Sequence, residues 1–199
     1  MREPRAPASA PTATRRQLHV GVPDGRVLTL DLADGAVLGT LRAPAAVTTQ
    51  VHVQGDRMLF GCADGQLRLV DRSRGAVEWA VAVGRVPGPA DLVMTRDRAC
   101  VATDAGVLIL DLADGGEVAV TLASEELLGL FSQADRVFAR ARRSTSAGGP
   151  PRDVLVALDA AGADILWEYV LTGEGPGAPC ADELHVALPS PDAGVLLFR

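Results

Sequence analysis

The sequence predicts an all-β fold built from a repeated unit, and two observations carry this prediction. Short apolar runs alternate along the chain with turns rich in Gly and Asp, which is the pattern of consecutive β-strands. An Asp that ends one run in each unit recurs at intervals of 40, 40 and 48 residues, at Asp31, Asp71, Asp111 and Asp159. A period near 40 with four strands per unit is typical of a β-propeller blade, so we expect about four and a half four-stranded blades.

The unit is clearest between Arg57 and Val83, where three strands are expected over residues 57–62, 66–70 and 76–83. Asp64-Gly65 predicts the first hairpin turn, because Gly supplies the positive φ that such turns require. Asp71 is expected to bond the free N–H groups of the second turn, and Gly75 to take its left-handed position. The matching glycines in the other copies are Gly35, Gly115 and Gly162.

The other elements follow the same pattern in chain order. The first copy has expected strands over 18–22, 26–30 and 36–41, and the innermost strand of the second blade is expected over 47–53. The third copy covers 90–122, the fourth carries a protruding loop over 144–151, and the incomplete fifth has strands over 184–188 and 195–198. Residues 124–131 fit either a strand or a short helix.

Most strands are apolar at almost every residue, as in VLVAL over 154–158. A sheet with one face in water would alternate instead, so this pattern predicts blades that are covered on both faces.

Two arrangements of the chain ends remain open. Residues 1–16 are rich in Pro and Ala and lack the apolar segment of a signal peptide, so we expect a disordered tail followed by a repeat domain over 17–199. In that case the blades form an open or incomplete ring, which we favour. Alternatively, residues 6–14 supply a missing strand and close a five-bladed ring, although Pro7 and Pro11 suit a central strand poorly.

Two segments carry a resemblance to a known family. GCADGQLRLVDRSRGAVEW, over 61–79, and VLVALDAAGADILWEY, over 154–169, resemble the pyrroloquinoline-quinone-type (PQQ-like) β-propeller repeats. The resemblance covers 17–199 and implies that Trp79 and Trp167 are the Trp residues that pack between blades; Gly39 and Ala119 occupy this position in the other copies. The family includes dehydrogenases, assembly scaffolds and sensor domains.

Composition excludes several functions. The net charge of −6 argues against nucleic acid or an anionic membrane as the main partner. The chain has no Lys, so neither a Walker-type phosphate loop nor a Schiff-base lysine can form. Cys62, Cys100 and Cys180 lack metal-ligand spacing and are expected to be reduced, which favours a cytoplasmic location. No apolar run reaches the length of a transmembrane helix.

The candidate site residues are few. His19 and His185 occupy a repeat position that holds apolar residues in the other copies, namely Leu59, Cys100 and Phe138, so we expect both to be packing residues. His52 lies on an expected inner strand and could face a central channel. The four regular Asp residues are assigned to turns. One basic cluster is either an exposed, charged strand edge or a contact for an anion or acidic partner; it comprises Arg140, Arg142, Arg143 and Arg152.

These observations favour a non-enzymatic propeller that acts as a protein-binding scaffold. Quinone enzymes of the resembling family depend on adjacent cysteines and a metal-binding Asn, and this sequence has neither. We therefore assign no catalytic, cofactor-binding or metal-binding residue and expect no cofactor. Two alternatives stay open: a partial or degenerate quinoprotein dehydrogenase, and a ligand-sensing domain detached from a larger regulatory protein. The expected partner is a protein, or a second copy of the chain paired through free blade edges.

Overall fold

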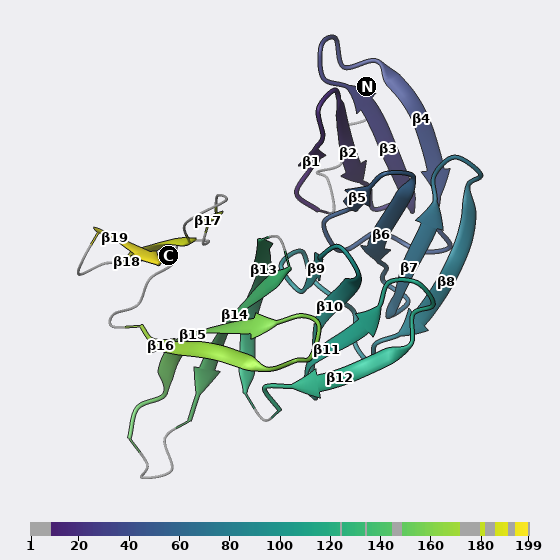
Figure 1. The fold of residues 1–199 in the computed structure, drawn as a ribbon. Coiled ribbons are helices and arrows are strands. Elements are labelled where there is room, and N and C mark those ends of the chain that lie inside the picture. Colours follow the sequence, from purple (N-terminus) through teal and green to yellow (C-terminus); the bar gives the residue numbers. More distant parts are fainter. Residues whose placement is uncertain are drawn as a thin grey trace. The chain divides into compact units, whose positions relative to one another are not determined.

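The computed structural model of the chain consists of antiparallel β-sheets (Figure 1). It describes residues 9–123, 125–133, 135–144, 149–171, 180–181, 186–190 and 194–198. Every regular element in these ranges is a strand, and 19 strands form five sheets. The expected all-β propeller repeat is therefore confirmed, with four complete four-stranded blades and one sheet of three strands.

The five sheets follow one another along the chain, and each strand pairs with its sequence neighbours. The first sheet contains β1 (Thr12–Ala13), β2 (Gln17–Gly21), β3 (Arg26–Asp31) and β4 (Val37–Arg42). The second contains β5 (His52–Gln54), β6 (Arg57–Gly61), β7 (Gln66–Asp71) and β8 (Ala76–Ala82). The third contains β9 (Leu92–Met94), β10 (Arg98–Thr103), β11 (Gly106–Asp111) and β12 (Glu117–Thr121).

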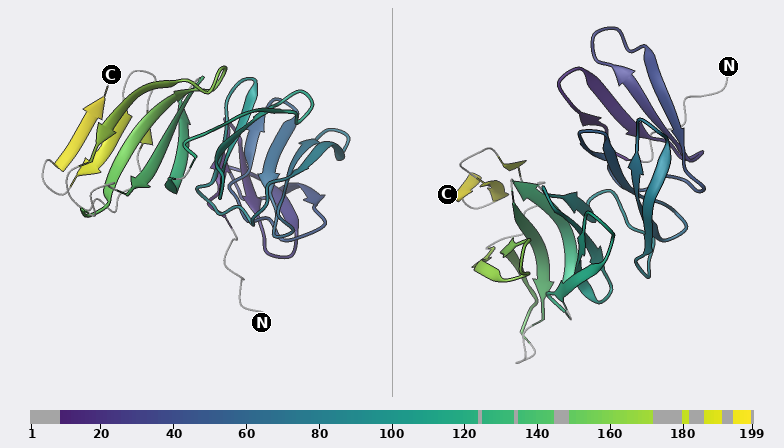
Figure 2. Two further views of the ribbon diagram at one scale, coloured as in Figure 1. Left: turned by 90° about the horizontal axis from the view of Figure 1, so that it is seen from below. Right: turned by 45° about the vertical axis from the view of Figure 1, so that its right-hand side comes forward.

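The last two sheets continue this order. The fourth contains β13 (Glu126–Gln133), β14 (Arg136–Arg143), β15 (Arg152–Asp159) and β16 (Ile165–Val170). The fifth contains β17 (Cys180–Ala181), β18 (Val186–Ser190) and β19 (Gly194–Phe198). Two further views show the twist of the individual sheets (Figure 2). The ambiguous segment 124–131 is resolved as a strand over its described residues from Glu126 onward.

The first sheet corrects the expected disordered tail over residues 1–16. Thr12 and Ala13 form β1 and pair antiparallel with His19 and Leu18 of β2. This pairing uses main-chain hydrogen bonds and needs no large apolar side chain. It begins just after Pro11, which has no N–H group to donate, so the prolines limit the strand to two residues without preventing it. Residues 1–8 lie outside the described part of the chain.

The expected innermost strand over 47–53 is shorter than predicted. Only His52–Gln54 form a regular strand, while Val47 makes a single bridge with Cys62. Thr49 explains the interruption, because its hydroxyl oxygen accepts the Gly61 N–H at 2.8 Å in place of a main-chain carbonyl.

The chain forms two compact units, one of residues 1–92 with 111–116 and the other of residues 93–110 with 117–199. The core of the first unit contains Val27, Val47, Val51, Met58, Phe60, Cys62 and Val70. The core of the second unit includes Val93, Cys100, Ile109, Val137, Val156 and Leu158. A neighbouring cluster places Phe138 against Trp167, with ring centroids 5.9 Å apart.

The regular Asp residues form turns, as predicted. The Oδ1 atom of each Asp accepts a hydrogen bond from the main-chain N–H group two residues later. The N to Oδ1 distances are 2.7 Å from Ala33, 2.8 Å from Ser73, 2.8 Å from Ala113 and 3.0 Å from Ala161. The left-handed position is filled by Gly35, Gly75 and Gly115, with φ of 73°, 64° and 75°. In the fourth copy this position is held by Ala163, with φ of 64°, so the assignment of Gly162 was wrong by one residue.

Replacing Ala163 with Gly is therefore expected to raise the free energy of unfolding by about 0.5–1 kcal/mol, because a Cβ atom disfavours the left-handed conformation. Chemical denaturation of the two proteins measures the difference. Gly35→Ala is the reverse control, since its added Cβ meets no atom within 4 Å and only the backbone cost remains. The explanation fails if Ala163→Gly destabilises the protein while Gly35→Ala leaves it unchanged.

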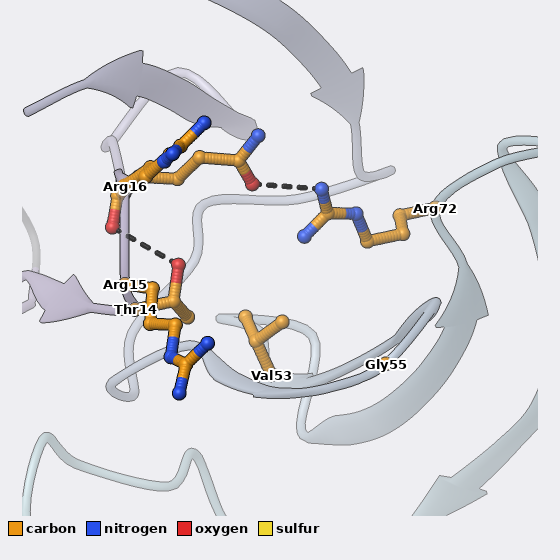
Figure 3. Close-up of a pocket in the computed structure, with 7 residues that line it drawn as sticks. Thr14, Arg15, Arg16, Val53, Gly55 and Arg72 are labelled. Atoms are coloured by element: carbon orange, nitrogen blue, oxygen red, sulfur yellow. Dashed lines mark hydrogen bonds between the residues drawn. The ribbon is translucent and has the colours of Figure 1, made fainter.

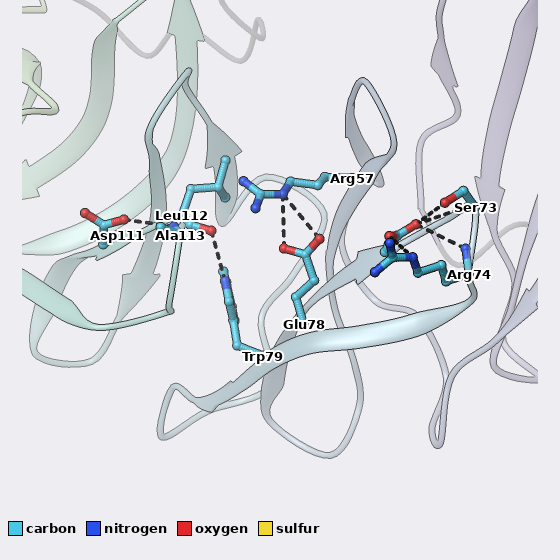
Figure 4. A network of polar contacts seen from close by, with 9 residues as sticks. Arg57, Ser73, Arg74, Glu78, Trp79, Asp111, Leu112 and Ala113 are labelled. Atoms are coloured by element: carbon cyan, nitrogen blue, oxygen red, sulfur yellow. Dashed lines mark hydrogen bonds and ion pairs between the residues drawn. The ribbon is translucent and has the colours of Figure 1, made fainter.

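Trp79 is a packing residue, as the repeat pattern predicts, and it lies against the turn between β11 and β12 (Figure 4). It lies on β8 and is only 8% exposed, and its indole Nε1–H donates to the Leu112 carbonyl oxygen at 3.1 Å. A Cβ atom at Gly115 would lie 2.9 Å from the Trp79 ring, so Gly115 supplies space as well as a positive φ. The turn between β11 and β12 thus closes over the Trp79 side chain.

Candidate functional site

The histidines are held by the fold. His19 is buried on β2, and its Nδ1 lies 3.1 Å from the Thr29 hydroxyl oxygen. Its pKa is lowered, chiefly by burial and further by the positive charge of Arg72. His52 Nε2 lies 2.9 Å from the Leu92 carbonyl oxygen, and burial lowers its pKa as well. His19 is a packing residue as predicted; His185 lies outside the described residues.

Three arginines of the basic cluster, Arg140, Arg142 and Arg143, are engaged with carboxylates. Arg140 and Arg142 both contact Asp153, with 2.8 Å from Arg140 Nη2 to Oδ2 and 2.8 Å from Arg142 Nε to Oδ1. Arg143 Nη2 contacts Glu125 Oε1 and lies 3.0 Å from Glu168 Oε1. The predicted exposed edge is wrong, because β14 lies between β13 and β15 rather than at the end of the sheet. These arginines stabilise the fourth sheet and do not form an open anion site.

Cys62 and Cys100 are buried free thiols. Burial raises the pKa of Cys62, and it raises the pKa of Cys100 to about 12. Neither thiol is therefore disposed to act as a nucleophile at neutral pH. Over the described ranges of the chain, no three His, Cys, Asp or Glu residues come together to hold a metal ion.

Exposed apolar side chains gather on the outermost strand of each four-stranded sheet. Of the large apolar residues that are exposed, nine lie on β4, β8, β12 and β16: Val37, Leu38, Val77, Val118, Val120, Ile165, Leu166, Tyr169 and Val170. The strands inside the sheets are largely buried; β6, β11 and β15 are examples. The expectation of sheets covered on both faces therefore holds for the inner strands and is wrong for the outermost ones.

β16 carries the largest share of this exposed apolar surface. Ile165, Leu166, Tyr169 and Val170 are each between 39% and 48% exposed, whereas Trp167 turns inward onto the cluster around Phe138. It is the last strand of its sheet, next to β15. Its large apolar side chains lie on both faces and are suited to contact another protein chain.

Sequence reasoning missed this surface because the sequence of β16 is as apolar as that of the buried β15. A signal was present nonetheless. The third strands of the second, third and fourth copies carry Glu78, Glu117 and Glu168 among apolar residues, and a carboxylate at such a position indicates a face that reaches water.

Comparisons with known proteins agree with this architecture. A family model described as outer membrane protein assembly factor BamB matches residues 23–177. The solved structures that are similar include the computationally designed Ika8 protein, with a TM-score of 0.72 and 16% identity, and BamB from Moraxella catarrhalis, with a TM-score of 0.67 and 17% identity. The β-propeller domain of Cps50 (Swd1) from Myceliophteria thermophila gives a TM-score of 0.71 at 15% identity.

The alignments with Ika8 and with BamB each cover 95% of this chain and 57% of the other chain. The alignment with the Cps50 domain covers 94% of this chain and 63% of the other. The chain thus spans less than two thirds of the length of the proteins it resembles. At these identities the likeness shows the fold alone. No curated protein matches the sequence. Among the described residues there is no helix that is long and apolar enough to cross a membrane.

Proposed function

The chain belongs to the PQQ-like β-propeller family of the outer membrane protein assembly factor BamB, and on that premise we propose that it is a non-enzymatic module that binds another protein. The exposed apolar edge of β16 is the observation that carries the proposal. Large apolar side chains in water are costly, and a contiguous group of them on the outermost strand of a sheet is characteristic of an interaction surface. Repeat folds also present broad surfaces for such contacts.

The engagement of the polar groups supports a non-enzymatic role. The four regular Asp residues accept hydrogen bonds within their own turns, and Arg140, Arg142 and Arg143 are bound to carboxylates. His52 is held by a main-chain carbonyl group. Groups that are committed to the fold in this way are poorly placed for acid–base or nucleophilic chemistry.

We propose a cytoplasmic location as well, and the unpaired thiols of Cys62 and Cys100 support it, since free cysteines are common in reducing compartments. The name of the matching family refers to the outer membrane. Fractionation of the native host tests this part of the proposal, and recovery of the chain outside the cytoplasm would reject it.

Affinity capture from the native host tests the binding function, with the full chain as bait and mass spectrometry as the readout. Leu166→Asp combined with Val170→Asp is expected to reduce recovery of the specific partner by about tenfold or more, because each charge would enter the apolar contact. Both side chains are nearly half exposed, so the bait should stay folded, which circular dichroism checks.

The matched control combines Val37→Asp with Leu38→Asp on β4, which is also an outermost strand with exposed apolar residues. This variant should keep the partner. Equal capture by all three baits, or no specific capture by the original chain, would reject β16 as the binding edge. If light scattering shows that the captured partner is a second copy of the chain, the surface is a homo-oligomer interface.

A further inference from the structure

The first unit contains a pocket with a strongly basic lining (Figure 3). Its cavity volume is about 620 Å³, within the range of small-molecule sites. Arg15 and Arg16 come from the loop between β1 and β2, and Arg72 follows β7. Val53 and Gly55 contribute a less polar wall from β5 and the turn after it.

Hydrogen bonds position the two basic segments. The N–H group and the hydroxyl of Thr14 both contact the Gln17 carbonyl oxygen, at 2.8 and 3.3 Å, and this closes the loop that carries Arg15 and Arg16. The Gln17 side-chain oxygen accepts from Arg72 Nη2 at 2.8 Å. The Arg72 N–H donates to the Asp56 carbonyl oxygen at 2.7 Å, so Arg72 is held at its backbone and at its guanidinium group.

The charges in this pocket are not compensated by the lining. Three lining residues are arginines and none is acidic. Over the part of the chain that the structure describes, Arg15, Arg16 and Arg72 make no ion pair, whereas Arg140, Arg142 and Arg143 of β14 are all paired. Such a concentration of positive charge is notable in a chain with a net charge of −6.

We infer that this pocket binds a small molecule through a multiply charged phosphate group. Guanidinium groups match the oxygen geometry of phosphate and donate to it in pairs. Figure 3 shows the Arg15 and Arg16 side chains leaving the loop in opposite directions, so an anion that reaches more than one guanidinium group must be larger and more highly charged than a single carboxylate. A diphosphate group supplies such charge in a compact form that fits the cavity. The inference does not depend on the proposed binding edge, because β16 belongs to the other unit.

Calorimetric titration of the full chain with inorganic pyrophosphate at low ionic strength tests the inference. The expected result is binding of one pyrophosphate per chain that weakens steeply with added salt. Arg72→Met should weaken binding by about tenfold or more, since it removes a charge-assisted donor. Gly55→Asp should do the same by placing a carboxylate at the wall, where the added Cβ meets no atom within 4 Å.

Gly55→Asn is the matched control, because Asn and Asp both tolerate the positive φ of 59° at this position and differ only in charge. It should bind pyrophosphate within about twofold of the original chain, which keeps the test decisive if Arg72→Met fails to fold. Absence of pyrophosphate binding overturns the inference. An affinity for pyrophosphate that is unchanged by both Arg72→Met and Gly55→Asp also overturns it. Tighter binding of citrate or of a Glu-rich peptide than of pyrophosphate also overturns it, and assigns the pocket to carboxylates instead.

Discussion

Replacing Trp79 with alanine is expected to lower the free energy of unfolding by about 3–5 kcal/mol, the range for a large aromatic residue removed from a core. The change deletes a side chain that is 8% exposed and removes the donor to the Leu112 carbonyl oxygen. That carbonyl would then be buried without its partner, and the turn that carries Gly115 would lose the ring on which it rests. Urea denaturation, followed by fluorescence of Trp167 and by circular dichroism, measures the loss.

Two further variants separate the contributions. Trp79→Phe keeps an aromatic ring but not the hydrogen bond, and a loss of about 1–2 kcal/mol is expected. Val77→Ala changes an exposed residue on the same strand, 53% accessible, and should stay within about 0.5 kcal/mol of the original protein. A midpoint unchanged by Trp79→Ala would mean that the contact of Trp79 with the 111–116 turn contributes little to stability.

Asp153→Asn is the second change with a large expected effect, a loss of about 2–3 kcal/mol at neutral pH. Asp153 is 12% exposed and is the partner of two guanidinium groups. Arg140, at 19% exposure, would keep its charge in a largely buried position without a carboxylate; Arg142, at 40%, can turn to water and contributes less. Asn is nearly isosteric, so the change isolates the charge from the packing.

The effect should depend on pH in a defined direction. Hydrogen bonds from Arg142 and then from Arg140 hold the pKa of Asp153 below its usual range. The stabilisation is therefore complete above the unfolded-state pKa of about 3.9 and disappears as the pH falls through the lower folded-state pKa. Denaturation of Asp153→Asn and the original protein over this range should show the two curves converging in acid. Asp24→Asn, in an exposed ion pair, should follow the original protein throughout; parallel curves for Asp153→Asn would contradict the explanation.

The features that sequence predicted well are set by short-range rules. The turn Asp residues bond groups two residues away, and the Asp-Gly hairpin at 64–65 needs only the positive φ of Gly65. Trp79 was placed by its match to Trp167 within the repeat. The assignment of Gly162 failed because residue type alone was used, and the backbone geometry places Ala163 in the left-handed position.

The features that were missed depend on residues far apart in the chain. Gln17 and Arg72 are separated by 55 positions, so the basic pocket cannot be seen in any local pattern. The same holds for Arg140 and Arg142, which read as a free basic cluster until β15 brings Asp153 beside them. The two residues of β1 carry no apolar signal, since their main-chain groups make the pairing.

Each sheet described above is made from one uninterrupted stretch of chain, with neighbouring strands joined in sequence order. None of these sheets needs a strand from a distant part of the chain, so each can form as soon as its own residues have left the ribosome. The entropic cost of closing its loops is also low, because the loops are short. Growth of such an array requires only that a gene segment of one period be duplicated or lost. One sheet is then the stretch of chain that folds during synthesis and that is gained or lost by gene duplication or deletion. This suits a fold whose relatives differ in length.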